Sequence, residues 1–290
     1  MKGFEQLCND VAYVRIDAVG LVEVAGPDAL KFLQALVSQD LDGIGVGETR
    51  HSLLLEPQGK LTADFHVVRV AEDMFWLRCE PEVGPLLAVG LARFKIRVDV
   101  RIEDCSARYQ ALVVRGPNSV GVAPNVPDGV HVATIDWPTS PGHELLGPTS
   151  LISSMSIPDV TEADLVALET LRIELGVARQ PADIDADTIA QEAALEVTAV
   201  SFTKGCFLGQ ELVCRIDSRG HVNKTMRRLR PSVEVSVGDE VVNLDGKVVG
   251  VVSSSAVSPR CGPVALATLR REVEQGAALR VSQTTTITLD

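Results

Sequence analysis

The order of strand and helix patterns in the first hundred residues constrains the fold more than any other feature of the sequence. A strand pattern is followed by a helix start at Gly26-Pro27-Asp28, by a hairpin around Glu56-Pro57-Gln58-Gly59, and then by a second helix and another strand. This order predicts a split β-α-β arrangement, as in ferredoxin-like α+β layers. The expected strands cover 21–25, 52–55, 61–70, 74–79 and 96–102, and the expected helices run from Pro27 to Val37 and over 81–94.

The middle of the chain adds two strand patterns, over 109–115 and 130–135, and one well-marked helix. Thr161, followed three residues later by Asp164, has the layout of a helix N-terminus, and leucines then recur at helical spacing until Gly176. We therefore expect a helix between Thr161 and Gly176.

From Met226 the pattern changes to short β runs separated by turns, of which Asp245-Gly246 is one. This alternation is typical of a small antiparallel barrel or sandwich. The sequence therefore predicts an α+β protein with two domains, an N-terminal one over 1–225 and a C-terminal β-barrel over 226–290.

The composition is that of a globular chain, since 46% of its 290 residues are hydrophobic and 23% are charged. The apolar runs fall well short of the roughly 20 residues that a membrane span needs. The first residues, Met1-Lys2-Gly3, lack the layout of a secretion signal. We therefore expect a cytoplasmic protein with no membrane partner.

The cysteines are scattered, without the regular spacing of a disulfide framework or a Cys-x-x-Cys pair that could hold zinc. No protein-bound metal site is predicted, and most of the thiols are expected to be small buried side chains. The six are Cys8, Cys79, Cys105, Cys206, Cys214 and Cys261.

The net charge of -12 argues against general nucleic-acid binding, which depends on neutralising phosphates. The charge is uneven, because residues 201–230 hold seven basic residues against Glu211 and Asp217. This window could hold an anion, with Arg219 and His221 orienting it. Equally, its cations could solvate a strand and a surface turn.

Cys206 lies in the segment Lys204-Gly205-Cys206-Phe207-Leu208-Gly209-Gln210-Glu211. Gly209 suits a helix N-cap, so a helix starting at Gln210 would point its positive dipole end toward the thiol, with Lys204 nearby in sequence. Both effects favour the thiolate and predict a reactive or ligating cysteine. The alternative is an ordinary buried cysteine.

Two acidic residues are further candidates. If Leu61, Ala63 and Phe65 share one strand face, Asp64 lies on the other and could move protons in a cleft. Glu174 ends a helix, where a negative charge opposes the dipole, so it could instead serve a ligand with an amidine-like edge. Alternatively, Asp64 faces solvent and Glu174 is there by chance.

The segment around Cys206 resembles the Lys-Gly-Cys-aromatic-x-Gly-Gln-Glu signature of the YgfZ folate-binding proteins, relatives of the glycine cleavage T-protein, an aminomethyltransferase. The similarity extends to 21–40, 59–65, the helix end 171–176, and 250–269. The resemblance implies a GcvT-like fold. It also implies a tetrahydrofolate-binding protein that assists the assembly or repair of iron-sulfur clusters in client enzymes, including those that thiolate tRNA.

The resemblance also implies roles for individual residues. The acid at the position of Asp64 works beside the folate one-carbon centre in the T-protein, and the acid at the position of Glu174 holds the pterin edge. Ala63 replaces a second Asp of the T-protein pattern, which argues against aminomethyl transfer. The residues expected to act in catalysis are Cys206 and Asp64, and those expected to contact folate are Asp64, Glu174, Lys204, Phe207, Arg215 and Arg219.

Three hypotheses follow from the sequence. In the first, the protein binds folate and Cys206 is a redox thiol or a transient ligand of an iron-sulfur cluster passed to client proteins. In the second, it is a folate-dependent one-carbon transferase or demethylase with Asp64 at the reacting centre. In the third, it is a non-catalytic module whose basic window docks a partner.

Overall fold

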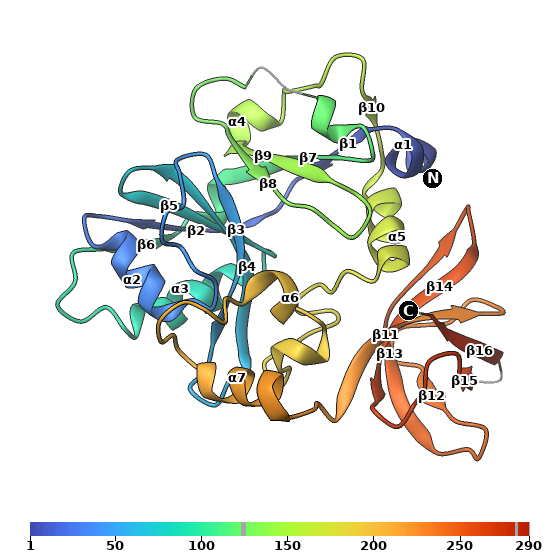
Figure 1. Ribbon diagram of the computed structural model, residues 1–290. Helices are drawn as coiled ribbons and strands as arrows, with labels where there is room; N and C mark the ends of the chain where they lie inside the picture. The colour runs from blue at the N-terminus through green and yellow to red at the C-terminus, as the bar shows by residue number, and fades with distance from the viewer. Residues whose placement is uncertain (123–125, 282–283, 290) are drawn as a thin grey trace.

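The computed structural model describes residues 1–122, 126–281 and 284–289. It contains two five-stranded sheets and a closed barrel, with the barrel at the side of the molecule where the chain ends (Figure 1). This is the α+β architecture with a C-terminal barrel that the sequence predicts.

The first sheet has the order β3-β4-β5-β2-β6 with antiparallel neighbours, and α2 and α3 pack on one of its faces. The predicted hairpin and helices are confirmed. The strand predicted over 96–102 is present as β6, but its predicted start is wrong: Arg97 has a φ of 56° that interrupts the extended chain, and β6 begins only at Arg101. The elements are β2 (Gly20–Ala25), α2 (Ala29–Leu36), β3 (Thr49–Leu55), β4 (Leu61–Ala71), β5 (Met74–Cys79), α3 (Gly84–Ala92) and β6 (Arg101–Asp104).

The second sheet has the order β10-β1-β7-β9-β8. It packs against the free face of the first sheet, where Leu21 and Trp76 contact Ala111 and Leu146. The strands at its centre and edges are β1 (Ala12–Ile16), β7 (Tyr109–Arg115), β8 (His131–Thr134), β9 (Gly142–Pro148) and β10 (Thr161–Glu162), and the short helices beside it are η1 (Ser106–Arg108), η2 (Ser119–Gly121) and α4 (Thr149–Ile152).

Helices α1 (Phe4–Asn9) and α5 (Leu165–Leu175) cover another part of the second sheet, through Phe4, Leu7, Ala167 and Leu171. The helix predicted before Gly176 is confirmed, and Gly176 ends it in the left-handed conformation with a φ of 74°. Its predicted start at Thr161 is wrong, because that residue pairs with β1 as part of β10 and the N-cap is Asp164.

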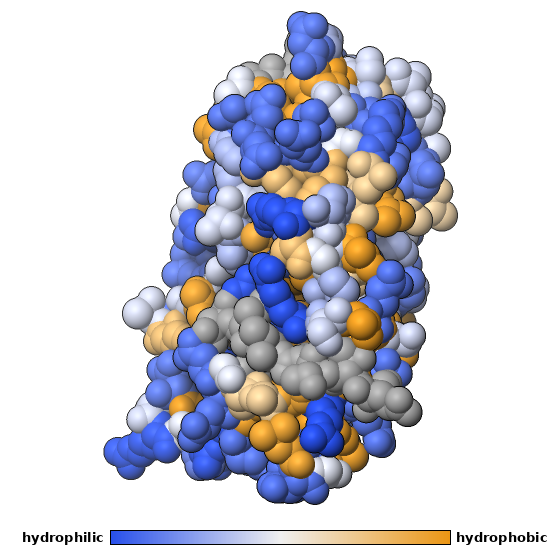
Figure 2. Space-filling model, turned by 90° about the vertical axis from the view of Figure 1, so that its right-hand side faces the viewer, coloured by the Kyte–Doolittle hydropathy of each residue, from blue (hydrophilic) through white to orange (hydrophobic). Residues whose placement is uncertain are grey.

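The barrel has the order β11-β14-β13-β12-β15-β16 and closes through pairing of β16 with β11. Its core contains Leu229, Val241 and Leu279. The side of the molecule that carries it shows hydrophobic residues scattered among hydrophilic ones (Figure 2). Its strands are β11 (Lys224–Pro231), β12 (Glu240–Val242), β13 (Val248–Ser258), β14 (Gly262–Arg270), β15 (Ala278–Val281) and β16 (Thr284–Leu289).

The segment between α5 and the barrel holds three more helices, η3 (Ala190–Glu192), α6 (Glu196–Ala199) and α7 (Gln210–Arg219). Residues from it, including Ile184, Val200 and Phe207, pack on Leu53 and Leu61 of the hairpin. This packing carries the Cys206 segment onto the first sheet. None of the helices in the described residues is both long and apolar enough to cross a membrane.

Candidate functional site

Lys204 is an anchor for the Cys206 segment. Its ammonium donates hydrogen bonds of 2.8 Å to the carbonyl oxygens of Gln34, Val37 and Gln39, at the C-terminal end of α2. An ammonium has three N–H donors, so these contacts use them all. Burial lowers the pKa of Lys204 to about 8, opposed by Asp40 and Asp42. The geometry therefore gives Lys204 a structural role, and its folate contact stays a prediction.

Gly209 is also required by the packing. Its φ is 78°, and a Cβ at this position would lie 2.5 Å from the carbonyl oxygen of Glu56. Gly59 faces it from the hairpin turn, where a Cβ would lie 2.7 Å from the Cβ of Leu212. The two glycines thus let the hairpin turn approach the start of α7. Gly209 is the N-cap of α7, as the sequence predicts.

Phe207 is 7% exposed and packs in the core with Leu53 and Leu61, so its ring is a hydrophobic anchor and not an available stacking surface. The Phe207 N–H donates to Gln210 Oε1 at 3.2 Å, which fixes the turn before α7. Like Lys204, Phe207 thus stabilises the fold, and its folate contact stays a prediction.

Gly205 and Cys206 differ from these neighbours. Both are exposed, Gly205 has no positive φ, and a Cβ placed on it would meet nothing within 4 Å. The fold therefore gives no steric reason for glycine at 205. The anchors on either side hold Cys206 on the surface just before α7, with open space beside it.

Asp64 lies on β4 opposite the Leu61, Ala63 and Phe65 face, as predicted, and its side chain is 18% exposed. Its Oδ1 is 2.5 Å from Nε2 of His51 on β3. In the tautomer of His51 that carries its proton on Nε2, this nitrogen donates the bond to the carboxylate. The Asp64 N–H donates to Gln180 Oε1 at 2.9 Å, so both its backbone and its side chain are held.

His51 connects Asp64 to the segment that leads to Cys206. Its Nδ1 is 2.7 Å from the hydroxyl of Thr198 on α6. Three residues on, the Ser201 N–H donates to the carbonyl of Ser38 at 3.0 Å, and Lys204 follows. Asp64 is thus hydrogen-bonded through His51 to Thr198, in the chain segment that continues to Cys206.

Polar side chains that are buried or half-buried pack beside His51. Its ring stacks on His66, with centroids 4.5 Å apart and planes inclined by 10°. Burial lowers the pKa of His66 well below 6.5, and the neighbouring His51 and Arg78 lower it further, so His66 is neutral. Arg78 is paired with Glu144 at 2.7 Å. The half-buried ring of His66 thus packs directly against the ring of His51.

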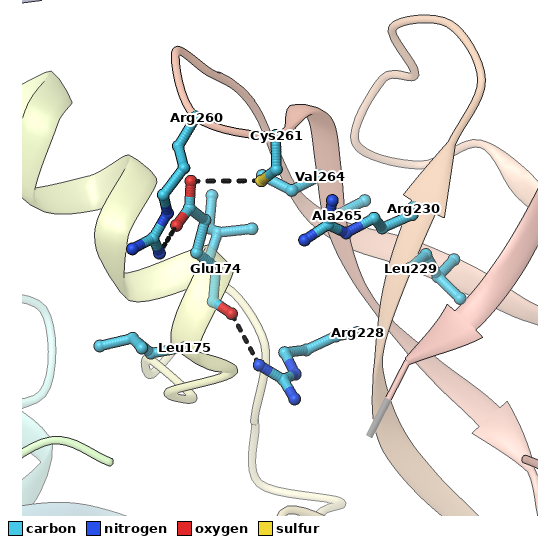
Figure 3. A pocket seen from close by; sticks show the side chains of 10 residues that line it. Glu174, Leu175, Arg228, Leu229, Arg230, Arg260, Cys261, Val264 and Ala265 are labelled. Carbon is cyan, nitrogen blue, oxygen red and sulfur yellow. Dashed lines mark hydrogen bonds and ion pairs between the residues drawn. The ribbon is translucent and has the colours of Figure 1, made fainter. Parts of the chain in front are cut away.

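Glu174 is the second-last residue of α5, and its side chain faces the barrel (Figure 3). Its side chain is 3% exposed; Oε2 is paired with Arg260, and Oε1 accepts from the thiol of Cys261 at 3.4 Å. Both carboxylate oxygens are thus engaged by the turn between β13 and β14. Glu174 lines a cavity of about 280 Å³, and Asp64 does not contribute to the lining of this cavity.

Arg215 and Arg219 lie one turn apart on α7 and line a second cavity, of about 510 Å³. His221 and the apolar side chains of Leu212 and Ile216 also line it. The predicted basic window therefore includes a real concavity. It lies at the opposite end of α7 from Cys206.

No sequence pattern pointed to His51, Gln180 or Arg260 as site residues. His51 pairs with His66 across the hairpin, so its place beside Asp64 depends on strand register, which the sequence does not reveal. Gln180 and Arg260 reach their partners from 116 and 86 residues away. Within the described residues no group of three or more His, Cys, Asp or Glu side chains could hold a metal ion.

Comparisons with known proteins agree with this architecture. A protein of Mycosarcoma maydis named iron-sulfur cluster assembly factor IBA57 homolog, mitochondrial, is 31% identical over 223 residues, which cover 71% of this chain and 53% of that protein. The chain thus spans about half the length of this curated relative.

The crystal structure of the glycine cleavage system aminomethyltransferase T from Bartonella henselae has the same fold, with a TM-score of 0.83 at 20% identity over 99% of this chain and 87% of that one. Residues 2–156 match the GCVT N-terminal domain, more than half of the chain. The chain therefore belongs to the GCVT N-terminal domain family, the YgfZ and GcvT-like group that its Cys206 signature predicts.

Proposed function

We propose that this protein binds tetrahydrofolate and assists the assembly or repair of iron-sulfur clusters in client enzymes, with Cys206 as its reactive thiol. The name of the Mycosarcoma maydis relative supports the cluster role, and the GCVT N-terminal domain supports the folate role. Enzymes that thiolate tRNA are among the expected clients, and the expected partners are folate and these proteins.

The accessibility of Cys206 carries the proposal. All six cysteines lie in the described residues, and only Cys206 is exposed. Iron-sulfur clusters are held by cysteine thiolates. A thiol on the surface can therefore bind a cluster transiently and release it to a client protein. The open space at Gly205 allows a partner's backbone to approach the sulfur closely.

Asp64 is the residue that best fits a folate-binding role. Its Oδ1 is fixed by His51, while Oδ2 makes no hydrogen bond within the described residues and so can accept one from a ligand. Bound folate would supply a one-carbon carrier; the chain would supply a carboxylate held in one orientation. Glu174 fits less well, because a pterin edge would have to displace Arg260 and Cys261 from it.

Replacing Cys206 with Ala in the source organism tests the thiol. We expect iron-sulfur enzyme activities and tRNA thiolation to fall as in the deletion strain, while the protein accumulates normally. Cys214→Ala is the matched control, because Cys214 is a half-buried thiol of α7. Full client activity in the Cys206→Ala strain would refute the role of this thiol.

Titration with tetrahydrofolate tests the second half of the proposal. The wild-type protein should bind, and Asp64→Asn should bind about tenfold more weakly or worse, since a charge-assisted hydrogen bond contributes roughly 1.5–3 kcal/mol. The absence of binding heat at millimolar folate would favour a non-catalytic module that docks a partner.

One observation favours a second candidate, a folate-dependent one-carbon transferase or demethylase. The chain of contacts from Asp64 through His51 to the exposed Thr198 could carry a proton between a bound substrate and solvent. Turnover of a methylamine-type substrate with tetrahydrofolate, lost in Asp64→Asn and kept in Cys206→Ala, would select this function over the first.

We also propose that 1–225 and 226–290 are separate domains and that the protein works in the cytoplasm. The start of the barrel strands at Lys224 supports the division. Limited proteolysis that cuts within a few residues of 225, and cell fractionation, test these two proposals.

A further inference from the structure

We propose that the cavity between α5 and β11 binds a small anion, a carboxylate or a phosphate, through Arg228 and Arg230. This site is distinct from Asp64 and from Cys206, and it does not depend on the function proposed above.

The cavity is partly apolar and partly cationic. Its volume is about 280 Å³, at the small end of the range for ligand pockets. Ile173, Leu175 and Val264 line it with apolar side chains, and Figure 3 shows the side chains of Arg228 and Arg230 extending from β11 toward α5. The size suits a fragment of a few atoms, not a whole folate.

The charges around the cavity do not balance. Glu174 is the acid of the lining, and its carboxylate is already paired with Arg260. Arg228 uses one nitrogen to donate to the Glu174 carbonyl oxygen at 2.8 Å, which fixes its guanidinium without neutralising it. No acidic side chain in the described part of the chain pairs with Arg228 or Arg230.

The strand geometry puts the two cations together. Leu229 is fully buried in the barrel core, so Arg228 and Arg230, its neighbours on β11, both project from the outer face. Residues i and i+2 of a strand lie roughly 6.5–7 Å apart. Two like charges at this spacing repel each other. An anion between them would be attracted by both guanidinium groups, and this attraction would outweigh their repulsion.

Arg228 is also preorganised. A Cβ on Gly176, which has a φ of 74°, would lie 2.9 Å from Cδ of Arg228, so the arginine stem packs directly on the end of α5. A guanidinium that is already held loses little entropy on binding, and its fork matches the two oxygens of a carboxylate or phosphate. These features explain why the ligand class is an oxyanion.

Isothermal titration of the whole protein at low ionic strength tests the site with two probes, inorganic phosphate and L-glutamate. Phosphate binding would indicate a phosphate-bearing ligand, and glutamate binding a carboxylate such as an amino-acid tail. We expect one of them to bind, and Arg230→Gln to weaken it about tenfold or more, the effect of losing a charge-assisted hydrogen bond. Arg230→Lys should keep part of the affinity, because it keeps the charge and loses the fork.

Arg280→Gln is the matched control, since it removes an exposed arginine of β15 that lines neither cavity. Its affinity for the bound probe should equal that of the wild type. Three outcomes would each overturn the proposal: no binding of either probe, an unchanged affinity in Arg230→Gln, or an equal loss in Arg280→Gln. Arg230 is exposed, so its variants should fold, and thermal unfolding without probe checks this.

Discussion

The Cys206 segment and the Glu174 pocket present two candidate functional residues in opposite situations. Around Cys206, the neighbours Lys204, Phe207 and Gly209 all make contacts that hold the fold together, while the thiol itself is exposed. In the cavity between α5 and β11 the reverse holds: the candidate residue Glu174 is itself engaged by the fold, because its carboxylate is buried and paired with Arg260.

This contrast separates what a motif needs for folding from what it offers to a ligand. A glycine or lysine in a signature can be required for folding alone. Only a residue whose identity the fold does not require is a candidate for contact with a ligand or partner. This criterion predicts that Cys206 and Gly205 are the functional part of their motif. In the pocket, the residues left over are Arg228 and Arg230.

The largest effect we expect comes from Gly209→Ala. Alanine would have to adopt a left-handed φ at this position, and its Cβ would clash with the Glu56 carbonyl oxygen. Together these effects should lower the free energy of unfolding by about 2–4 kcal/mol. Gly205→Ala is the control and should change it by less than about 0.5 kcal/mol. Urea denaturation measures both. Equal losses in the two variants would break the distinction between the structural and the functional glycine.

Lys204→Met should come next. The substitution keeps the apolar stem and leaves the three carbonyl oxygens at the end of α2 without their donor, so the protein should lose about 1.5–3 kcal/mol. Folate affinity, measured by titration of the folded variant, should remain that of the wild type. A folded Lys204→Met protein with normal stability and weakened folate binding would return Lys204 to the ligand site.

Much of this architecture is predictable from local patterns. Alternation of Leu61, Ala63 and Phe65 placed Asp64 on the correct strand face, and the helix start at Gly209 followed from residue preferences alone. These features depend on neighbours in sequence. The short barrel strands were likewise visible as apolar runs between turns.

The rest depends on contacts between distant parts of the chain. Strand β9 has a Gly at its first residue and a Pro at its last, so local preferences hide it, and pairing with β7 along its full length makes it a strand. Thr161 looked like a helix cap and is instead held in β10 by β1. The engagement of Glu174 by Arg260 likewise follows from where the barrel docks on α5.

Glu174 and Arg260 should show a moderate coupling. Glu174→Gln leaves Arg260 without its charge partner, but Arg260 is 52% exposed and can turn to solvent, so we expect a loss of about 1 kcal/mol. A double-mutant cycle with Arg260→Gln measures the coupling energy by denaturation. If Arg260→Gln also tightens folate binding, the pairing competes with the pterin; if binding is unchanged, Glu174 serves the fold alone.

The smallest expected effect on stability belongs to Cys206→Ser. An exposed thiol with no hydrogen bond in the described residues contributes little to the folded state, so the free energy of unfolding should change by less than about 0.5 kcal/mol. Cys261→Ser is the counterpart from the pocket, where the half-buried thiol donates to Glu174. The comparison between the regions predicts that thiol-reactive probes modify Cys206 first and fastest. Faster modification of Cys261 would mean that the turn opens readily and that Glu174 is available to a ligand after all.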